Sequence, residues 1–296
     1  MEHFTGTEFS LENTCVSFGS FDGMHLGHRA VMAQMLRHPE CRSVVLSFEA
    51  PADEKVIYDE EEKKLLLKEM GVDTLISYPA AAARALSAAD FVRQVLAEKL
   101  GAKIVVVGEG FTFGSDGGDV ALLQKLAPVY GYAVVVCGTV SLDGAEVSAA
   151  AIRAAFDAMD FAKATALMGH TYIMYGKVMH GKAEGRTVGM PTANLGVPAN
   201  KLFPPHGVYA TLSDFDGTKH RGLTNIGLRP SADTIPKATI ETFILNFSGD
   251  LYDKYILLEV HKYIRGVQKF KDLAAVKEQV NKDIAQVHEY LEQIGQ

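Results

Sequence analysis

Cysteine is scarce in this chain, and long apolar runs are absent. Only three cysteines occur among 296 residues, at positions 15, 41 and 137. An odd number at wide spacing argues against a disulfide framework or a zinc site, so we expect reduced thiols and a cytoplasmic location. The longest apolar run, Tyr132–Cys137, has the length of a strand, whereas a membrane-spanning helix needs about 20 residues. Residues 1–10 also lack the apolar segment of a signal peptide.

The chain as a whole also has no surplus of basic residues. The formal net charge is −7, with 13 Lys and Arg against 23 Asp and Glu in residues 1–160 and 16 against 13 in residues 161–296. Neither part is basic enough for tight binding of duplex nucleic acid, so we expect small-molecule substrates, no nucleic acid or membrane partner, and a monomer or weak homo-oligomer. The length and the uneven charge predict two domains, at 1–157 and 171–296, joined by a linker at 158–170.

The first half alternates short apolar runs with amphipathic runs of about ten residues. This order predicts a doubly wound, Rossmann-like parallel sheet with helices on both faces. The expected strands are Thr14–Phe18, Ser43–Phe48, Thr74–Tyr78, Ile104–Gly108 and Tyr132–Cys137, and the expected helices are His25–Leu36, Asp59–Met70, Ser87–Leu100 and Asp119–Tyr130.

The pattern changes after a helical stretch at Ser148–Leu167. Short strands separated by Gly, Pro and Asx turns then indicate a small antiparallel barrel. The expected strands are Ile173–Val178, Val208–Leu212, Thr239–Leu245 and Ile256–Val260. Apolar residues at helical spacing over Asp272–Ile294 predict a C-terminal helix that covers the barrel.

A glycine-rich motif, SFGSFDGMHLGH at Ser17–His28, follows the first expected strand. Its glycines permit a tight turn and a close approach of a ligand to the backbone. The N-terminus of the following helix attracts anions, and His25 and His28 could donate hydrogen bonds to phosphate oxygens. The alternatives are an exposed helix face or half of a metal site, although no Glu or Cys lies at a spacing that suits zinc.

This motif resembles the His-x-Gly-His signature of nucleotidyltransferases, and in detail the N-terminal module of bacterial bifunctional riboflavin kinase/FAD synthetases. The similarity continues over Glu62–Asp73, Leu86–Phe91, Leu100–Gly114 and Val147–Arg153. The resemblance implies adenylylation of FMN to FAD by ATP, with release of pyrophosphate. It implies catalytic roles for His25 and His28, flavin contacts for Phe111 and Phe113, and ATP contacts for Gly19, Phe21, Asp22, Gly27, Ser148 and Arg153.

The N-terminal module also departs from the family pattern. Ser20 replaces an Asn, Gly110 replaces an Asp, and Ala149 and Ala150 replace two hydroxyl residues. A family Pro-His-Pro stretch is also missing after the second strand, near Pro51. Each lost hydrogen bond to a charged phosphate costs about 1.5–3 kcal/mol. We therefore expect weak adenylyl transfer, and a riboflavin kinase with a degenerate N-terminal module is the alternative.

A second motif, GKAEGRTVGMPTAN at Gly181–Asn194, precedes the expected barrel strands. The Thr192 hydroxyl and the Asn194 amide oxygen, two residues apart on extended backbone, point the same way and suit a hard cation such as Mg²⁺. A polar loop between strands is the alternative. The motif resembles the signature of riboflavin kinases, and the similarity continues over Pro205–Tyr209, Asn225–Ser231, Glu241–Phe247, Ile264–Arg265 and Lys269–Phe270.

This second resemblance implies a six-stranded kinase barrel that phosphorylates riboflavin to FMN with ATP and Mg²⁺. It assigns Mg²⁺ to Thr192 and Asn194, flavin binding to Arg265, and ATP binding to Gly181, Lys182, Gly185 and Arg186. Glu241 would be the general base that accepts the proton of the riboflavin 5′-hydroxyl. The alternative for Glu241 is an outward-facing strand carboxylate, and the alternative for the whole chain is a non-catalytic flavin- or nucleotide-binding regulator.

Overall fold

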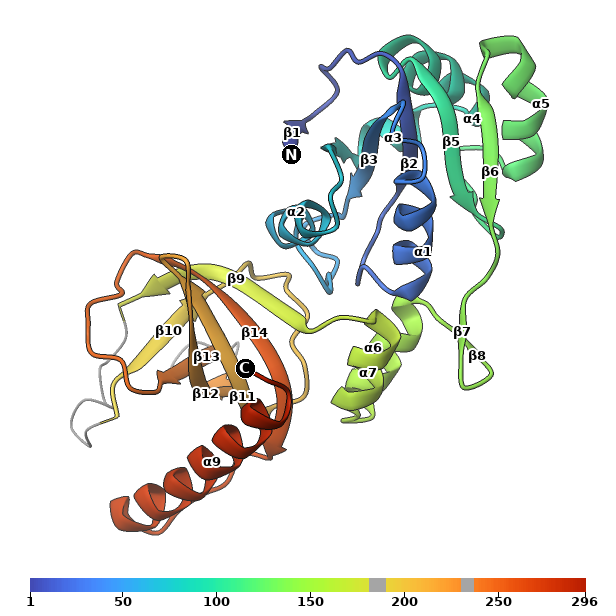
Figure 1. Ribbon diagram of the computed structural model, residues 1–296. Coiled ribbons are helices and arrows are strands. Elements are labelled where there is room, and N and C mark those ends of the chain that lie inside the picture. Colours follow the sequence, from blue (N-terminus) through green and yellow to red (C-terminus); the bar gives the residue numbers. More distant parts are fainter. Residues whose placement is uncertain (181–189, 230–236) are drawn as a thin grey trace. The chain divides into compact units, whose positions relative to one another are not determined.

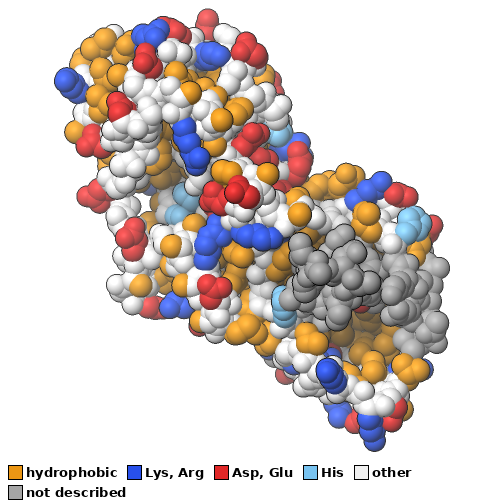
Figure 2. Space-filling view, turned by 180° about the vertical axis from the view of Figure 1, so that it is seen from behind, with side chains coloured by type: hydrophobic (Ala, Val, Ile, Leu, Met, Phe, Trp, Pro, Cys, Tyr) orange, Lys and Arg blue, Asp and Glu red, His pale blue; other side chains and the backbone are white. Residues whose placement is uncertain are grey.

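The computed structural model describes residues 1–180, 190–229 and 237–296 (Figure 1). The chain divides into two compact units, Met1–Ala151 and Ile152–Gln296. The division falls inside helix α6 (Ala149–Asp157), a few residues before the expected end of the first domain at 157. On the face shown in Figure 2, acidic and basic side chains are interspersed with apolar ones.

The first unit is built on a six-stranded sheet in the order β1-β4-β3-β2-β5-β6, and every neighbouring pair is parallel. All six residues of β2 are buried, because both faces of the sheet are covered. The predicted parallel-sheet fold is therefore confirmed. The strands are β1 (Glu2–Thr5), β2 (Thr14–Gly19), β3 (Arg42–Glu49), β4 (Thr74–Pro79), β5 (Ala102–Gly108) and β6 (Ala133–Cys137), with a small hairpin of β7 (Ser141–Leu142) and β8 (Ala145–Glu146).

Side chains cap the starts of three helices of this unit, α2, α4 and α5. Asp59 and Glu62 form a reciprocal capping box at the start of α2. Ser87 and Asp119 likewise accept backbone N–H groups at the starts of α4 and α5. The helices are α1 (Leu26–Met35), α2 (Glu60–Glu69), α3 (Ala80–Ala85), α4 (Ala88–Phe91), which continues as the π-helical segment η1 (Val92–Lys99), and α5 (Val120–Tyr130).

The second unit contains a closed barrel in the order β10-β13-β12-β11-β14-β9, and every pairing in it is antiparallel. The predicted six-stranded barrel is confirmed. Its strands are β9 (Tyr172–Met179), β10 (Thr192–Gly196), β11 (Gly207–Phe215), β12 (Thr218–Arg229), β13 (Lys237–Ile244) and β14 (Tyr255–Arg265). Helix α7 (Phe161–Met168) precedes the barrel and α9 (Leu273–Gln293) follows it.

Helix α9 covers one wall of the barrel, as expected from its apolar spacing (Figure 1). Val287 and Leu291 of α9 are fully buried against a cluster that includes Val208, Leu212 and Leu223. These three strand residues therefore face outward from the barrel, toward the helix. Glu241 lines a cavity on this same wall, together with Val208, Leu223 and residues of α9.

Three buried threonine hydroxyls form a row across adjacent barrel strands. The Thr224 Oγ1 lies 2.8 Å from the Thr211 Oγ1 and 2.9 Å from the Thr242 Oγ1. All three side chains are buried. Because strand residues alternate between faces, Thr242 faces the opposite way from its neighbour Glu241.

Five strands were not predicted from the sequence: β1, β10, β12 and the two short hairpin strands β7 and β8. β1 is four residues long and carries a charge, and it is held at the sheet edge by its pairing with β4. β12 contains charged residues and two glycines, and β10 follows a glycine-rich segment. Neither shows clear alternation, and their pairing partners on both sides hold them in the barrel.

Candidate active sites

The carboxyl end of β2 leads through a short turn into α1. His25 is the N-cap residue of α1, and its ring Nδ1 accepts a hydrogen bond from the His28 N–H at 3.4 Å. The two imidazole rings stack with their centroids 3.6 Å apart. A Cβ atom on Gly27 would lie 3.1 Å from the His25 ring, so glycine leaves the space that this ring occupies. His25 therefore caps the helix, whereas the sequence placed it at the first helical position.

Both imidazoles are neutral at pH 7. Burial lowers the pKa of His25 to about 4, against the opposing effect of the Asp22 carboxylate. Burial, together with His25 and the Lys63 ammonium, lowers the pKa of His28 well below its ordinary value. Because Nδ1 of neutral His25 accepts a hydrogen bond, its single proton lies on Nε2, which can donate to a ligand. Nδ1 of His28 is buried and has no hydrogen-bond partner among the described residues.

A cavity of about 290 Å³ opens at the carboxyl ends of β2, β5 and β6. Ligands of open parallel sheets bind at this edge, and a helix N-terminus there favours an anion. The cavity brings together six of the residues expected to bind ATP or flavin or to act in catalysis: Gly19, Phe21, His25, Gly27, His28 and Phe111. We refer to it as the histidine cavity.

Three of the residues expected to contact ATP lie outside the lining of the histidine cavity. Asp22 is buried, and its Oδ1 accepts the N–H groups of Ile57 at 2.8 Å and Tyr58 at 3.2 Å. Asp22 therefore ties the turn to the segment before α2. Ser148 accepts the Ala151 N–H at 3.1 Å at the start of α6, and Arg153 lies further along that helix.

A second cavity of about 280 Å³ in the same unit is lined by three aromatic residues, by small residues and by the charged Glu49, Glu54 and Arg84, and we refer to it as the aromatic cavity. Phe48, Phe91 and Phe113 contribute to its walls. Phe113 is nearly parallel to Phe111 of the histidine cavity, with their centroids 6.1 Å apart. Ser20 lines both cavities, so the turn after β2 is where the two meet.

In the barrel, one row of polar residues crosses three adjacent strands. Glu241 on β13 lies directly opposite Asn194 on β10 and opposite Asn225 on β12. Residues paired in this way have Cβ atoms about 4.5–5.5 Å apart on the same face. Thr192, two residues before Asn194, shares that face. Asn194 and Asn225 therefore lie on either side of Glu241 on this face of the barrel.

Glu241 lines a cavity of about 310 Å³ that also includes residues of α9, and we refer to it as the apolar cavity. Leu223, Phe243, Phe270 and Val280 supply apolar walls. Glu241 does face outward from the barrel, as the alternative interpretation held, but it faces into this cavity.

Arg265 lines the apolar cavity and is held in place by a buried carboxylate. Its Nε lies 3.0 and 3.1 Å from the two oxygens of Asp283, and its NH2 lies 2.8 Å from Oδ2. The carboxylate of Asp283 also accepts from Gln279 Nε2 at 2.8 Å, and Asp283 is fully buried. Such a bidentate ion pair fixes the plane of the guanidinium.

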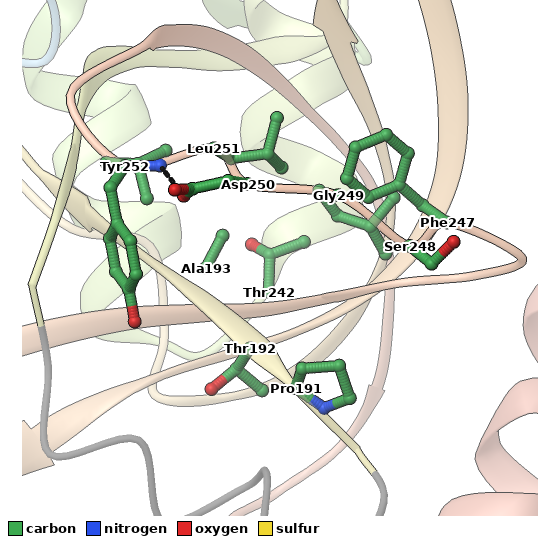
Figure 3. Close-up of a pocket in the computed structure, with 12 residues that line it drawn as sticks. Pro191, Thr192, Ala193, Thr242, Phe247, Ser248, Gly249, Asp250, Leu251 and Tyr252 are labelled. Carbon is green, nitrogen blue, oxygen red and sulfur yellow. Dashed lines mark hydrogen bonds between the residues drawn. The ribbon is translucent and has the colours of Figure 1, made fainter.

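A further cavity of about 130 Å³ lies on the other side of Thr192, and we refer to it as the loop cavity (Figure 3). Pro191 and Thr192 lie on one side of it, and the loop that follows β13 lies across from them (Figure 3). In this loop Asp250 Oδ1 accepts the Tyr252 N–H at 2.9 Å. Thr192 also lines the apolar cavity, so this residue stands at the junction of the two.

Some predicted residues lie outside the described part of the chain, and two other residues of interest were not predicted from the sequence. Gly181, Lys182, Gly185 and Arg186 fall outside the described residues. Asp283 was not singled out, although a lone acidic residue within the apolar stripe of α9 is a recognisable sign of a buried ion pair. Lys63, discussed below, lies in the charged run EEEKK, where no pattern distinguishes a buried lysine from exposed ones.

Within residues 1–180, 190–229 and 237–296, no group of three or more His, Cys, Asp or Glu side chains is placed to hold a metal ion. Oxygen donors of another kind are present, namely the Thr192 hydroxyl and the Asn194 amide on β10. In the same described part of the chain, no helix is both long enough and apolar enough to cross a membrane.

The chain matches two protein-family models. Residues 8–151 match the FAD synthetase family, and residues 168–291 match the riboflavin kinase family. Two relatives are each called bifunctional riboflavin kinase/FMN adenylyltransferase. The one from Pseudomonas fluorescens is 36% identical over 287 residues, covering 92% of this chain and 91% of the relative. The one from Escherichia coli K12 is 34% identical over 295 residues, covering 94% and 93%.

A solved structure is similar over almost the whole chain. It is the crystal structure of a Streptococcus pneumoniae protein named macrolide-efflux protein, with a TM-score of 0.82 and 26% sequence identity. The match covers 96% of this chain and 99% of that one.

Proposed function

Because the chain belongs to the family of bifunctional riboflavin kinase/FMN adenylyltransferases, we propose that it converts riboflavin to FMN and FMN to FAD. ATP is the second substrate of both reactions. We assign the phosphorylation to the barrel, which matches the riboflavin kinase family, and the adenylylation to the parallel-sheet unit, which matches the FAD synthetase family. The three cysteines are free thiols, which supports a cytoplasmic enzyme.

One observation carries the kinase assignment: Thr192 lines both the loop cavity and the apolar cavity. Phosphoryl transfer needs the nucleotide and the acceptor in two sites that meet at the reacting phosphate. We place ATP in the loop cavity and the flavin ring in the apolar cavity, beside Phe243, Phe270 and Arg265. Thr192 then stands where the γ-phosphate meets the riboflavin 5′-hydroxyl.

Glu241 supplies the base for this reaction. Its carboxylate accepts the proton of the 5′-hydroxyl while the hydroxyl oxygen bonds to the γ-phosphorus, and the bond from that phosphorus to ADP breaks. Asn194 and Asn225 lie opposite Glu241 on the neighbouring strands and limit the positions open to its side chain.

The donor set on β10 fits Mg²⁺. Mg²⁺ is usually held by one or two protein oxygens together with water and substrate phosphates, and Thr192 and Asn194 offer two such oxygens on one face. When bound, the ion would neutralise charge on the ATP phosphates.

In the parallel-sheet unit we place ATP in the histidine cavity and the FMN ring in the aromatic cavity. An oxygen of the FMN phosphate bonds to the α-phosphorus of ATP, and the bond to the pyrophosphate leaving group breaks. The Nε2–H of His25 and the N-terminus of α1 donate to the phosphate oxygens as negative charge moves onto pyrophosphate. Ser20 lines both cavities, and this position supports the meeting of the two substrates at the turn.

The test is chromatography of the products formed from riboflavin, ATP and Mg²⁺. FMN together with FAD is the expected result. FMN alone would favour the kinase with a degenerate N-terminal module, to which the alanines at 149 and 150 point. Absence of both products, with flavin still bound, would favour a non-catalytic regulator.

A further inference from the structure

Lys63 is a buried lysine outside the residues assigned so far. It lies near the start of α2, and its side chain is 3% exposed. Its ammonium group donates to the Ser20 carbonyl oxygen at 2.7 Å, to Ser47 Oγ at 3.1 Å and to Glu60 Oε1 at 2.8 Å. An ammonium has three N–H donors, so these three acceptors fix its position.

The Ser20 carbonyl belongs to the turn that separates the histidine cavity from the aromatic cavity. The next residue, Phe21, has a φ of +47°, which an L-residue adopts only when its surroundings hold it there. Asp22 is tied to the N–H groups of Ile57 and Tyr58. Residues of α2 and of the segment before it thus hold this turn at both ends.

We propose that Lys63 is a positioning residue for adenylyl transfer, because it holds the Ser20 carbonyl and thereby the turn at which ATP and FMN meet. This inference rests on the proposed adenylyl transfer. In a planar trans peptide the carbonyl and the following N–H point in opposite directions. By fixing the Ser20 oxygen, Lys63 sets the direction of the Phe21 N–H.

A purely structural role predicts something different. Lys63 could serve only to neutralise Glu60, whose Oε2 accepts from Ser77 Oγ at 2.7 Å. In that case, removing both charges would restore thermal stability and kcat together. The double variant Lys63→Met with Glu60→Gln separates the roles, because it removes the unpaired charge without restoring a donor to the Ser20 carbonyl.

The experiment compares Lys63→Met, the double variant and Lys64→Met in the full chain. Lys64 is the matched control because it lies on the same helix, is 36% exposed and pairs with Glu61. The readouts are kcat and KM for FAD formation from supplied FMN and ATP, thermal stability, FMN formation from riboflavin, and hydrogen exchange of the peptide spanning residues 17–28.

We expect Lys63→Met to lower kcat for FAD formation tenfold or more, since a displacement of about 1 Å can cost about 10²-fold. The double variant should regain thermal stability without regaining kcat, and both should show faster exchange in the turn. The kcat for FAD formation should be unchanged in Lys64→Met, and FMN formation from riboflavin should be unchanged in all three variants. Wild-type kcat in Lys63→Met, recovery of kcat in the double variant, or unchanged exchange would each overturn the role of Lys63. A wild-type chain that forms no FAD would instead overturn adenylyl transfer itself, and this role with it.

Discussion

Glu241 on β13 lies directly opposite Asn194 on β10 in the antiparallel register of the barrel. This pairing brings the proposed base next to the proposed Mg²⁺ donors without any contribution from a long loop. It also means that the spacing between the two groups is set by backbone hydrogen bonds of the barrel.

Replacing Glu241 with Gln should abolish FMN formation while FAD formation from supplied FMN continues. The amide keeps the shape of the side chain but accepts no proton, and loss of a general base costs about 10²–10⁴-fold in rate. Chromatographic assay of each half-reaction measures this. Glu259→Gln is the control, because Glu259 is a strand carboxylate of β14 that pairs with Lys219. If both half-reactions fell together in Glu241→Gln, the assignment to two separate sites would be wrong.

Replacing Thr192 and Asn194 together with Ala should raise the Mg²⁺ concentration at which the kinase is half-active. The pair supplies two oxygen donors that alanine lacks. A Mg²⁺ titration of FMN formation measures the shift, with the exposed Thr218→Ala as the control on the same barrel. An unchanged titration curve would return this segment to a simple connecting role.

FAD formation from FMN and ATP should be measurable but slow, and His28→Ala should remove it. The stacked histidines and the helix N-terminus are present, whereas the family's hydroxyls at 149 and 150 and its acid at 110 are missing. Poorer positioning of ATP and FMN slows FAD formation but does not abolish it while the groups that face the phosphates are present. Radiolabelled ATP detects low turnover, and His38→Ala is the control because His38 pairs with Glu40 away from both cavities. FAD production that survived in His28→Ala would refute the phosphate site.

Breaking the Arg265–Asp283 pair from one side should destabilise the second unit. Asp283→Asn leaves the partly buried Arg265 guanidinium without its fully buried carboxylate partner, and removing one partner of a buried pair costs about 3–5 kcal/mol. Urea unfolding measures the loss, and the KM for riboflavin should rise because Arg265 lines the apolar cavity. The double variant Arg265→Met with Asp283→Leu should be less destabilised than Asp283→Asn. A double variant as unstable as the sum of its single changes would contradict the coupling.

Acid should destabilise the first unit through its histidines. Burial lowers the pKa of folded His25 from 6.5 to about 4. Between these values the unfolded chain binds the proton and the folded chain does not, so the free energy of unfolding falls as the pH drops from about 6.5 to about 4. Urea unfolding at pH 7.5 and pH 5 measures the fall, which should be smaller in His25→Gln. Equal falls in the two proteins would assign the pH dependence to other groups.

Much of the fold could be predicted because its signals are local. Alternating strands and helices, and the caps Asp59, Ser87 and Asp119, follow from short stretches of sequence. β10 and β12 could not be predicted, because neighbouring strands of the barrel hold them in place. The same distinction applies to the sites. The motifs point to Glu241 and the histidines, whereas Lys63 is recognised by its contacts with Ser20 and Ser47, and Asp283 by its contact with Arg265, all 16 or more residues away along the chain.

The threonine row in the barrel has an evolutionary consequence. Thr224 is hydrogen-bonded to both Thr211 and Thr242, so stepwise replacement of the row by valine passes through a sequence in which a buried hydroxyl has no partner left in the row, at a cost of about 1–3 kcal/mol. Replacing all three with the nearly isosteric valine leaves no hydroxyl in the row unpaired and can be close to neutral. Two stable sequences are therefore separated by less stable intermediates. Among descendants of a common ancestor, these three positions should change together or stay as they are.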